Sequence, residues 1–268
     1  TGLIYAVIFA AMCLLRPQAW RAFAVQRSLL LLGLAAGATN VGFNWAVTQG
    51  DVVRVVLLFY LMPLWSVVLA WAFLGERPTA AALARVALAL TGVAVVLKTP
   101  EVAWPLPASQ ADWLGVAAGF GFAVTNILLR RLRTAPGESR ALAMFGGCAV
   151  LACLTALGGT AIGAFAPPPW AAASGWLGWA ALLATGFVLA NVCLQYGAAR
   201  LAASATSVIM LSEVLFASAS SVALGAGTMG ARTWIGGALI VLAALWSAIA
   251  RTPGGADDRR SPAAKDTP

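Results

Sequence analysis

Nine long apolar runs divide the chain, and short segments rich in glycine, proline and arginine separate them. The runs cover residues 1–15, 29–49, 51–74, 79–98, 112–131, 141–165, 178–200, 202–225 and 232–250. A helix needs about 20 apolar residues to cross the hydrocarbon core of a bilayer, so the pattern predicts nine membrane-spanning segments. Because every connection is short, neighbouring segments are expected to be antiparallel.

The low share of charged residues places the chain in a membrane. Charged residues make up 10% of the sequence, apolar residues make up 61%, and the mean hydropathy is +0.88. Soluble domains carry about 25% charged residues. A chain in lipid must satisfy its backbone hydrogen bonds internally, so the segments are expected to be helices. The sequence therefore predicts an all-α polytopic membrane protein whose first partner is the lipid bilayer.

Basic residues fall unevenly on the two sides that alternating connections define. One side carries Arg16, Arg21, Arg27, Arg77, Arg85, Arg130, Arg131, Arg133, Arg140, Arg200, Arg251, Arg259, Arg260 and Lys265. The other side carries Arg54, Lys98 and Arg232. The positive-inside rule makes the first side cytoplasmic. The net charge of +8 is thus a topology signal, and no nucleic-acid partner is expected.

A seven-residue pattern occurs twice, 151 residues apart. Asn40–Ala46 reads NVGFNWA and Asn191–Gly197 reads NVCLQYG. The shared order is Asn-Val, any residue, an apolar residue, an amide, an aromatic and a small residue. Following this pairing along the chain matches the first four runs to the last four. Run 112–131 remains without a partner, which predicts a further N-terminal helix in the native protein.

Ten helices would then form two repeats of five. An odd number of helices inverts the second repeat relative to the first, and inverted repeats support alternating access around a site near the bilayer midplane. We expect residues 1–98 to form the first repeat without its first helix, and 99–111 to form a linker. Residues 112–250 are expected to form the second, inverted repeat. The polar segment 251–268 is expected to be a disordered cytoplasmic tail.

The repeated amides are the first candidates for a substrate site. Asn40 and Asn44 lie one turn apart in one repeat, and Asn191 and Gln195 lie at the matching positions in the other. Polar side chains within membrane helices usually face a bundle interior or a wet cavity. They could bind the polar groups of a substrate without a fixed charge. The alternative is that they form interhelical hydrogen bonds that stabilise the bundle, and the sequence leaves both open.

A proline and several aromatic residues mark a second candidate region. Pro63 lies near the centre of its run, where proline removes a backbone hydrogen bond and kinks a helix, so we interpret it as a hinge. Tyr60, Trp65 and Ser66 flank it and are expected to line a cavity, with a tolerated kink and helix packing as the alternatives. Trp45 and Tyr196 occupy matching positions in the repeat and could form aromatic walls or gates.

One acidic residue lies near the middle of a run. Glu213 matches Met62 in the repeat, and an intramembrane carboxylate is a functional candidate by default. We interpret it as a candidate for coupling transport to protons, against the alternative of a neutral acid that is hydrogen-bonded to nearby hydroxyl groups such as that of Ser212.

Other chemistry is poorly supported. The sequence has no histidine, and its four cysteines lie in apolar runs without metal-ligand spacing, so neither a metal site nor a cofactor is expected. All five aspartates lie in connections or the tail. An enzyme would need a nucleophile–base pair or a metal cluster at one depth, and the chain is expected not to be an enzyme.

Several motifs resemble a known family. Pro63, then Leu74-Gly75-Glu76-Arg77-Pro78, then an apolar run with Gly92 resemble the drug/metabolite transporter superfamily, and in particular its EamA-type exporters with ten helices. The chain looks similar to the bacterial aromatic amino acid exporter branch. The second repeat departs from the family pattern, with Val214 in place of a second proline and Gly225-Ala226 in place of Gly-Glu.

The resemblance implies a multi-pass carrier in the bacterial inner membrane, with both termini cytoplasmic in the intact protein. We expect it to export amino acids, aromatic or neutral and over a broad range, by alternating access. A broad drug or metabolite exporter or a flippase-like carrier is the main alternative, ahead of a channel or a membrane enzyme. A monomer is expected, and a dimer stays open because three glycine pairs have the spacing of close helix contacts.

Overall fold

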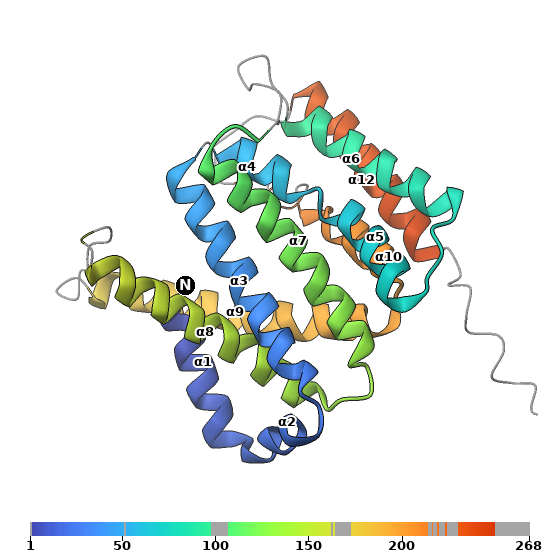
Figure 1. Cartoon of the computed structure of the whole chain (residues 1–268). Coiled ribbons are helices and arrows are strands. Elements are labelled where there is room, and N and C mark those ends of the chain that lie inside the picture. The colour runs from blue at the N-terminus through green and yellow to red at the C-terminus, as the bar shows by residue number, and fades with distance from the viewer. Residues whose placement is uncertain are drawn as a thin grey trace, which may run out of the picture.

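The computed structural model describes residues 2–50, 52–97, 107–161, 163, 173–213, 216, 219, 223 and 230–249, and these residues are mainly helical (Figure 1). In chain order, the elements are α1 (Gly2–Leu15), η1 (Pro17–Trp20), α2 (Arg21–Val25), α3 (Ser28–Gln49), α4 (Val52–Phe59), α5 (Met62–Leu74), α6 (Ala80–Leu97), α7 (Gln110–Arg131), α8 (Gly137–Ala161), α9 (Ala173–Arg200), α10 (Ala203–Met210) and α12 (Ala231–Ile249). The predicted tail 251–268 and most of the predicted linker lie outside the described residues, as do Val214, Gly225 and Ala226.

Five segments are long and apolar enough to cross a membrane: Ser28–Gln49, Arg54–Leu74, Gln110–Arg131, Gly137–Ala161 and Leu177–Arg200. The segments Gly2–Leu15 and Pro17–Phe23 meet at an angle of 100° and could together supply a sixth. The apolar helices within Ala80–Val96 and Trp234–Ser247 are shorter. The prediction of a helical chain is confirmed for the described residues, which include five to six candidate membrane spans by length and composition.

Three boundaries differ from the hydropathy pattern. Helix α9 begins at Ala173 rather than at residue 178. Residues 17–25, predicted to be a connection, form the short helices η1 and α2. Helix α8 begins at Gly137 rather than at residue 141, and its first turn contains Glu138. An acidic residue stabilises the start of a helix because it faces the positive end of the helix dipole. Because the first turn of α8 is polar, the apolar run in the sequence begins after it.

Helix α7 lies at the centre of the bundle, with α3 along one side and α4 and α5 along another (Figure 1). Glycines allow this close approach. A Cβ atom placed on Gly119 would lie 2.5 Å from the carbonyl oxygen of Phe59, and one placed on Gly115 would lie 3.1 Å from that of Val55. Gly33 of α3 faces Ala143 of α8 in the same way, at 2.6 Å from its carbonyl oxygen. Small residues let helix backbones meet in lipid.

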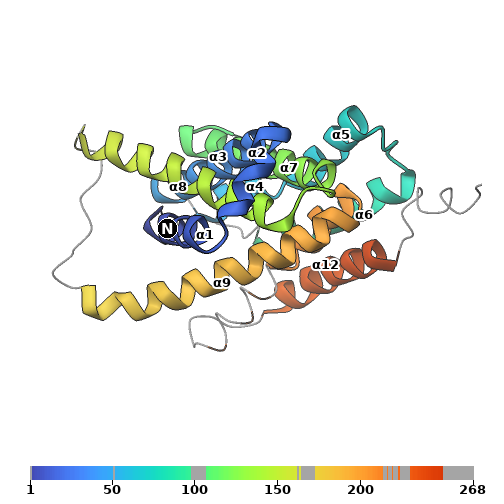
Figure 2. The same cartoon turned by 90° about the horizontal axis from the view of Figure 1, so that it is seen from below.

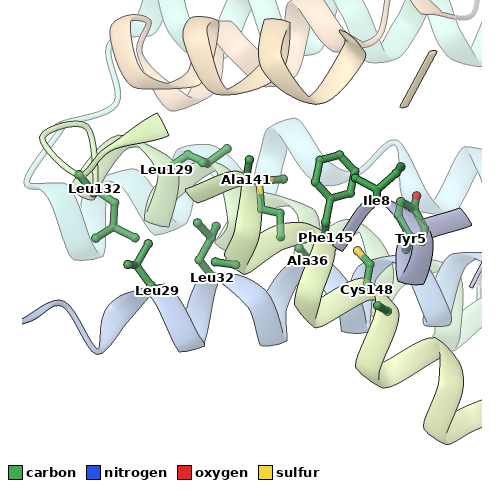
Figure 3. Close-up of a cluster of buried hydrophobic side chains, with 14 of the residues drawn as sticks. Tyr5, Ile8, Leu29, Leu32, Ala36, Leu129, Leu132, Ala141, Phe145 and Cys148 are labelled. Atoms are coloured by element: carbon green, nitrogen blue, oxygen red, sulfur yellow. The ribbon is translucent and has the colours of Figure 1, made fainter. Parts of the chain in front are cut away.

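The largest buried cluster joins α1, α3, α7 and α8. Figure 3 shows Leu29, Leu32 and Leu132 together at one end of the cluster, and Phe145 and Tyr5 at the other. The buried hydroxyl of Ser139 donates a hydrogen bond to the carbonyl oxygen of Ala19 at 2.8 Å and attaches η1 to the start of α8. These contacts fix α8 against α1 and α3, and this framework carries one wall of the cavity described below.

The helical span 52–74 is broken in its middle. The break lies at Tyr60 and Leu61, just before Pro63 in the first turn of α5. The Leu61 N–H reaches back to the carbonyl oxygen of Leu58 at 3.3 Å, a spacing of three residues in place of four. Proline lacks an N–H and disfavours helical backbone before it, which explains the position of the break.

A second break follows α10. The Ser212 N–H donates to the carbonyl oxygen of Ile209 at 3.0 Å, again with a spacing of three residues. Both partners lie 151 residues after Leu61 and Leu58, the same separation as in the repeated sequence pattern. No proline accompanies this second break, since Val214 stands at the position that matches Pro63. The two breaks therefore share a position without sharing the residue that explains the first.

Candidate substrate cavity

A cavity of about 600 Å³ lies between the helices. Its walls come from α1, α3, α7, α8, α9 and α10, and include Tyr5, Ala36, Thr39, Asn40, Phe122, Thr125, Met144, Phe145, Cys148, Phe187, Ala190, Asn191, Cys193, Leu194, Gly197, Leu201, Thr206, Ile209 and Met210. None of these lining residues carries a formal charge. The cavity is apolar and aromatic, with a few amide and hydroxyl groups.

Asn40 enters the cavity from the middle of α3. Its side-chain nitrogen donates to the hydroxyl of Tyr5 on α1 at 2.9 Å. Tyr5 is buried and its ring lies 5.4 Å from that of Phe187 on α9. The sequence pattern does not predict Tyr5 as a site residue, because its one distinguishing feature is that it is one of three tyrosines in a very apolar chain. The pair Tyr5–Asn40 forms a polar point on an otherwise aromatic wall.

Asn191 enters the same cavity from α9. Its side-chain nitrogen lies 3.5 Å from the sulfur of Met144 on α8. The amide of Gln195, which is buried, lies one turn further along α9 and is hydrogen-bonded to the side-chain amide of Asn191 at 2.5 Å. Gln195 therefore orients Asn191 without lining the cavity. The structure brings Asn40 and Asn191 together at one cavity, and each also contacts a neighbouring helix.

The other members of the repeated pattern lie elsewhere. The side-chain nitrogen of Asn44 donates to the backbone carbonyl of Asn40 at 2.8 Å, so this amide binds its own helix. Trp45 is 37% exposed and Tyr196 is 63% exposed, and neither lines the cavity. The guanidinium carbon of Arg200 lies 3.7 Å from the centre of the Tyr196 ring. The structure thus differs from the expectation of aromatic walls at these two positions.

The reason is helical geometry. Residues four apart share a helix face, whereas residues one apart point in different directions. Once Asn191 and Gln195 face the interior of the protein, Tyr196 must point away from them. The same rule turns Trp45 away from the face that carries Asn40 into the cavity.

The residues around Pro63 pack against other helices instead of lining this cavity. Trp65 meets the ring of Phe120 on α7 edge-on at 5.7 Å, and its buried indole N–H has no hydrogen-bond partner among the described residues. Ser66 is fully buried. Tyr60 is buried at the break itself, and its hydroxyl donates to Glu213 Oε1 at 2.7 Å. This bond joins the broken span 52–74 to the break that follows α10.

Ionic contacts hold both ends of α7. At its start, the guanidinium of Arg54 binds Asp112 with nitrogen–oxygen distances of 2.9 and 3.0 Å. Asp112 also accepts hydrogen bonds from the backbone N–H groups of Ala108 and Ser109 and forms a capping box with Ser109. At the other end of α7, Arg130 Nε lies 2.5 Å from Glu76 Oε1. Both contacts attach α7 to the broken span 52–74 or its flanking residues.

The described part of the chain contains no cluster of three or more cysteine, aspartate or glutamate side chains that could hold a metal ion. The described helices border an uncharged cavity that is partly open and has room for a small organic molecule.

One family model matches the N-terminal part of the chain. Residues 1–98 match the EamA-like transporter family, a branch of the drug/metabolite transporter superfamily. The match covers residues 1–98 of the 268 residues, and it shows that this part of the chain is similar to EamA-like transporters. Members of this family are carriers without enzymatic activity.

The fold is also found in a solved structure. The chain superposes on a crystal structure of a protein with a TM-score of 0.67 and 24% sequence identity, over 92% of this chain and 86% of the other. At this identity the likeness concerns the fold alone. No curated protein matches the sequence. The comparisons thus give a family match for residues 1–98 and a likeness of fold over most of the chain, and they give no support for the aromatic amino acid exporter branch.

Proposed function

We propose that the protein is a secondary carrier that exports amino acids with aromatic or other neutral side chains by alternating access. The observation that carries the proposal is the convergence of Asn40 and Asn191 on one uncharged cavity. These two residues hold matching positions in the sequence repeat. Their amides could bind the carboxylate and ammonium groups of an amino acid by hydrogen bonds.

The remaining lining favours an apolar or aromatic substrate side chain. Phe122, Phe145 and Phe187 come from three different helices, and Tyr5 adds a fourth ring. Aromatic rings prefer offset or edge-on contacts with one another at centroid distances of about 4.5–7 Å. A cavity without arginine, lysine, aspartate or glutamate disfavours a substrate with an extra charge, since that charge would be buried without a partner.

Two inverted repeats would explain the transport cycle. The matching helix breaks at Leu61 and Ser212, 151 residues apart, support this division. Helices α6 and α12 also pack closely side by side, with a Cβ on Gly92 only 2.7 Å from the carbonyl oxygen of Gly236. In this proposal residues 1–98 and 112–250 form the two repeats, and Pro63 is a hinge.

Helix α9 supports a further element of this proposal. It lies along one face of the bundle (Figure 2), and no residue in its most apolar stretch is buried. Its exposed large side chains include Leu177, Trp179, Leu182, Leu183, Leu189 and Val192. The matching helix α3 is covered by α7. We infer that a tenth helix, equivalent to α7, covers α9 in the native protein.

The proposed orientation puts the arginine-rich ends in the cytoplasm. Arg16 at the end of α1 binds Glu138 at the start of α8 at 3.1 Å, and Arg130 binds Glu76. These contacts join connections that carry many of the basic residues. By the positive-inside rule this end faces the cytoplasm of a bacterial inner membrane. Glu213, held by Tyr60 between the two breaks, remains the candidate for proton coupling.

Counterflow in proteoliposomes tests the carrier proposal. Vesicles preloaded with an unlabelled aromatic amino acid should accelerate entry of the labelled one, whereas a channel would show no acceleration. Asn40→Ala and Asn191→Ala should raise the half-saturating concentration roughly three- to tenfold, because one hydrogen bond contributes about 0.5–1.5 kcal/mol. Thr48→Ala on the same helix is the matched control, since Thr48 binds its own backbone and does not line the cavity.

The outcomes separate the alternatives. Preserved transport with a lower Tm in both asparagine variants would show that these amides only stabilise the bundle. Counterflow of hydrophobic drugs or lipid-like metabolites, without counterflow of any amino acid, would replace the amino acid proposal with a broad exporter or a flippase-like carrier.

A further inference from the structure

Arg130 connects three segments that are far apart in the sequence. It lies in the last turn of α7, and its side chain is 18% exposed. One nitrogen, Nε, binds the Glu76 carboxylate in the connection between α5 and α6. Another, Nη1, donates to the backbone carbonyl oxygen of Leu201 in the connection between α9 and α10. The planar guanidinium group can hold two partners at once in fixed directions.

The Glu76 side of this contact depends on a glycine. Helix α5 ends at Gly75, which adopts a left-handed conformation with φ of 69°. Only glycine reaches this region at little cost, and the turn lets the Glu76 N–H donate to the carbonyl oxygen of Ala70 at 3.2 Å. The chain changes direction at Gly75, and the Glu76 carboxylate that follows faces Arg130. The Gly75-Glu76 pair thus has a local structural role: it ends a helix and presents a carboxylate to α7.

The Leu201 side of the contact reaches the cavity. Leu201 lines the cavity wall, as does Gly197, whose carbonyl oxygen accepts the Leu201 N–H at 2.9 Å. Asn191 lies further up the same helix. A restraint on the Leu201 carbonyl therefore acts on the end of α9 and on the start of α10, two helices that form much of the cavity.

We propose that Arg130 is a positioning residue for transport: by holding the Leu201 carbonyl while bound to Glu76, it restrains the α9–α10 connection and limits access to the cavity from that end. Opening at this end requires release of the Leu201 carbonyl, and the ion pair with Glu76 keeps the Arg130 side chain in place for rebinding. The inference rests on the proposed carrier function, because it assigns the restraint to a step of alternating access.

The other reading of these contacts is a structural ion pair that merely joins α7 to the α5–α6 connection. A structural ion pair needs opposite charges at positions 76 and 130, but it does not need a hydrogen-bond donor to the Leu201 carbonyl. The two readings differ for a charge swap. Glu76→Arg with Arg130→Glu keeps opposite charges at the two positions, but a glutamate cannot donate a hydrogen bond to the Leu201 carbonyl.

The reactivity of Cys148 provides a readout that does not need a substrate. This cysteine is buried and lines the cavity on α8. The labelling rate with a membrane-impermeant maleimide is measured from each face of the membrane, in intact cells and in inside-out vesicles. The background variant replaces the other three cysteines, Cys13, Cys153 and Cys193, with alanine.

Arg130→Gln and the charge swap should both raise Cys148 labelling about tenfold from the face where Arg130 lies, the size expected when a charge-assisted hydrogen bond is lost. Labelling from the other face should not rise. Arg131→Gln is the matched control, because it removes the same charge from the neighbouring exposed position. Arg130→Lys, which keeps a point charge and loses the planar fork, should give an intermediate rate.

Thermal unfolding in detergent separates folding from access. The charge swap should recover most of the Tm that Arg130→Gln loses while its labelling stays fast. Labelling of the folded charge swap at the wild-type rate would overturn the proposal and leave a structural ion pair. These comparisons hold whether or not the wild-type protein shows counterflow, so a failure of the carrier proposal and a failure of the Arg130 proposal are read separately.

Discussion

Removing the charge of Asp112 tests how the start of α7 is held. The Asp112 side chain is 3% exposed, and that of Arg54 is 19% exposed. Asp112→Asn keeps the shape of the side chain but leaves the Arg54 guanidinium without its carboxylate. Breaking a buried ion pair by removing one partner costs about 3–5 kcal/mol. Since Arg54 keeps partial contact with solvent, we expect a loss at the lower end, about 3 kcal/mol.

This loss converts into a measurable change in thermal stability. For a chain of this size, 1 kcal/mol shifts Tm by about 2–4 °C, so Asp112→Asn should lower Tm by about 6–12 °C in detergent. The assay is thermal unfolding of the purified protein, followed by tryptophan fluorescence. The double variant with Arg54→Gln should recover part of the loss, because it removes the uncompensated charge.

A second ion pair in the chain supplies the control. Arg16 and Glu138 are also paired, at 3.1 Å, but their side chains are 57% and 43% exposed. Exposed pairs contribute at most about 1 kcal/mol. Glu138→Gln makes the same chemical change as Asp112→Asn and should lower Tm by no more than about 4 °C. Equal shifts for the two variants would refute the argument from burial.

Three further predictions concern packing and the cavity. Gly119→Ala should destabilise the protein by about 1–3 kcal/mol, measured as a lower Tm, because its new Cβ meets the Phe59 carbonyl. Gly158→Ala should leave Tm unchanged, because Gly158 has open space around it. Tyr60→Phe removes the bond to Glu213 and should abolish stimulation by a pH gradient while counterflow remains; unchanged stimulation contradicts coupling through this pair. Phe187→Ala removes a ring from the cavity wall and should weaken binding of aromatic amino acids roughly three- to tenfold in counterflow competition, because an aromatic contact is worth about 0.5–1.5 kcal/mol.

The positions of the helices could be predicted from the sequence, because the cause is simple. A segment in lipid must be long, apolar and helical, and hydropathy records this directly. The broken span could be predicted for the same reason, since Pro63 removes a specific hydrogen bond. The polar first turn of α8 was outside the predicted run, because its stability comes from residues such as Glu138 and not from hydropathy.

The contents of the cavity could be predicted only in part. A repeat identifies residues in matching positions, such as Asn40 and Asn191, but it does not say which neighbours in the pattern share their face. The partners of these residues depend on contacts between helices distant in sequence. Tyr5 meets Asn40 across 35 residues, and Met144 meets Asn191 across 47. No local pattern in a single sequence specifies such pairs.

The same 151-residue spacing also reveals a difference between α3 and α9. On α3, the residues before Asn40 include Gly33 and Gly37, and these bring the backbones of α3 and α8 together. The matching positions on α9 are Ala184 and Val188. These larger residues do not allow the backbone contact that glycine allows. Helix α9 contacts α1 through side chains instead, including the rings of Phe187 and Tyr5. The two helices that carry the repeated sequence pattern thus meet their neighbours differently: α3 approaches α8 through Gly33 and Gly37, whereas α9 contacts α1 through side chains at the cavity that Asn40 and Asn191 share.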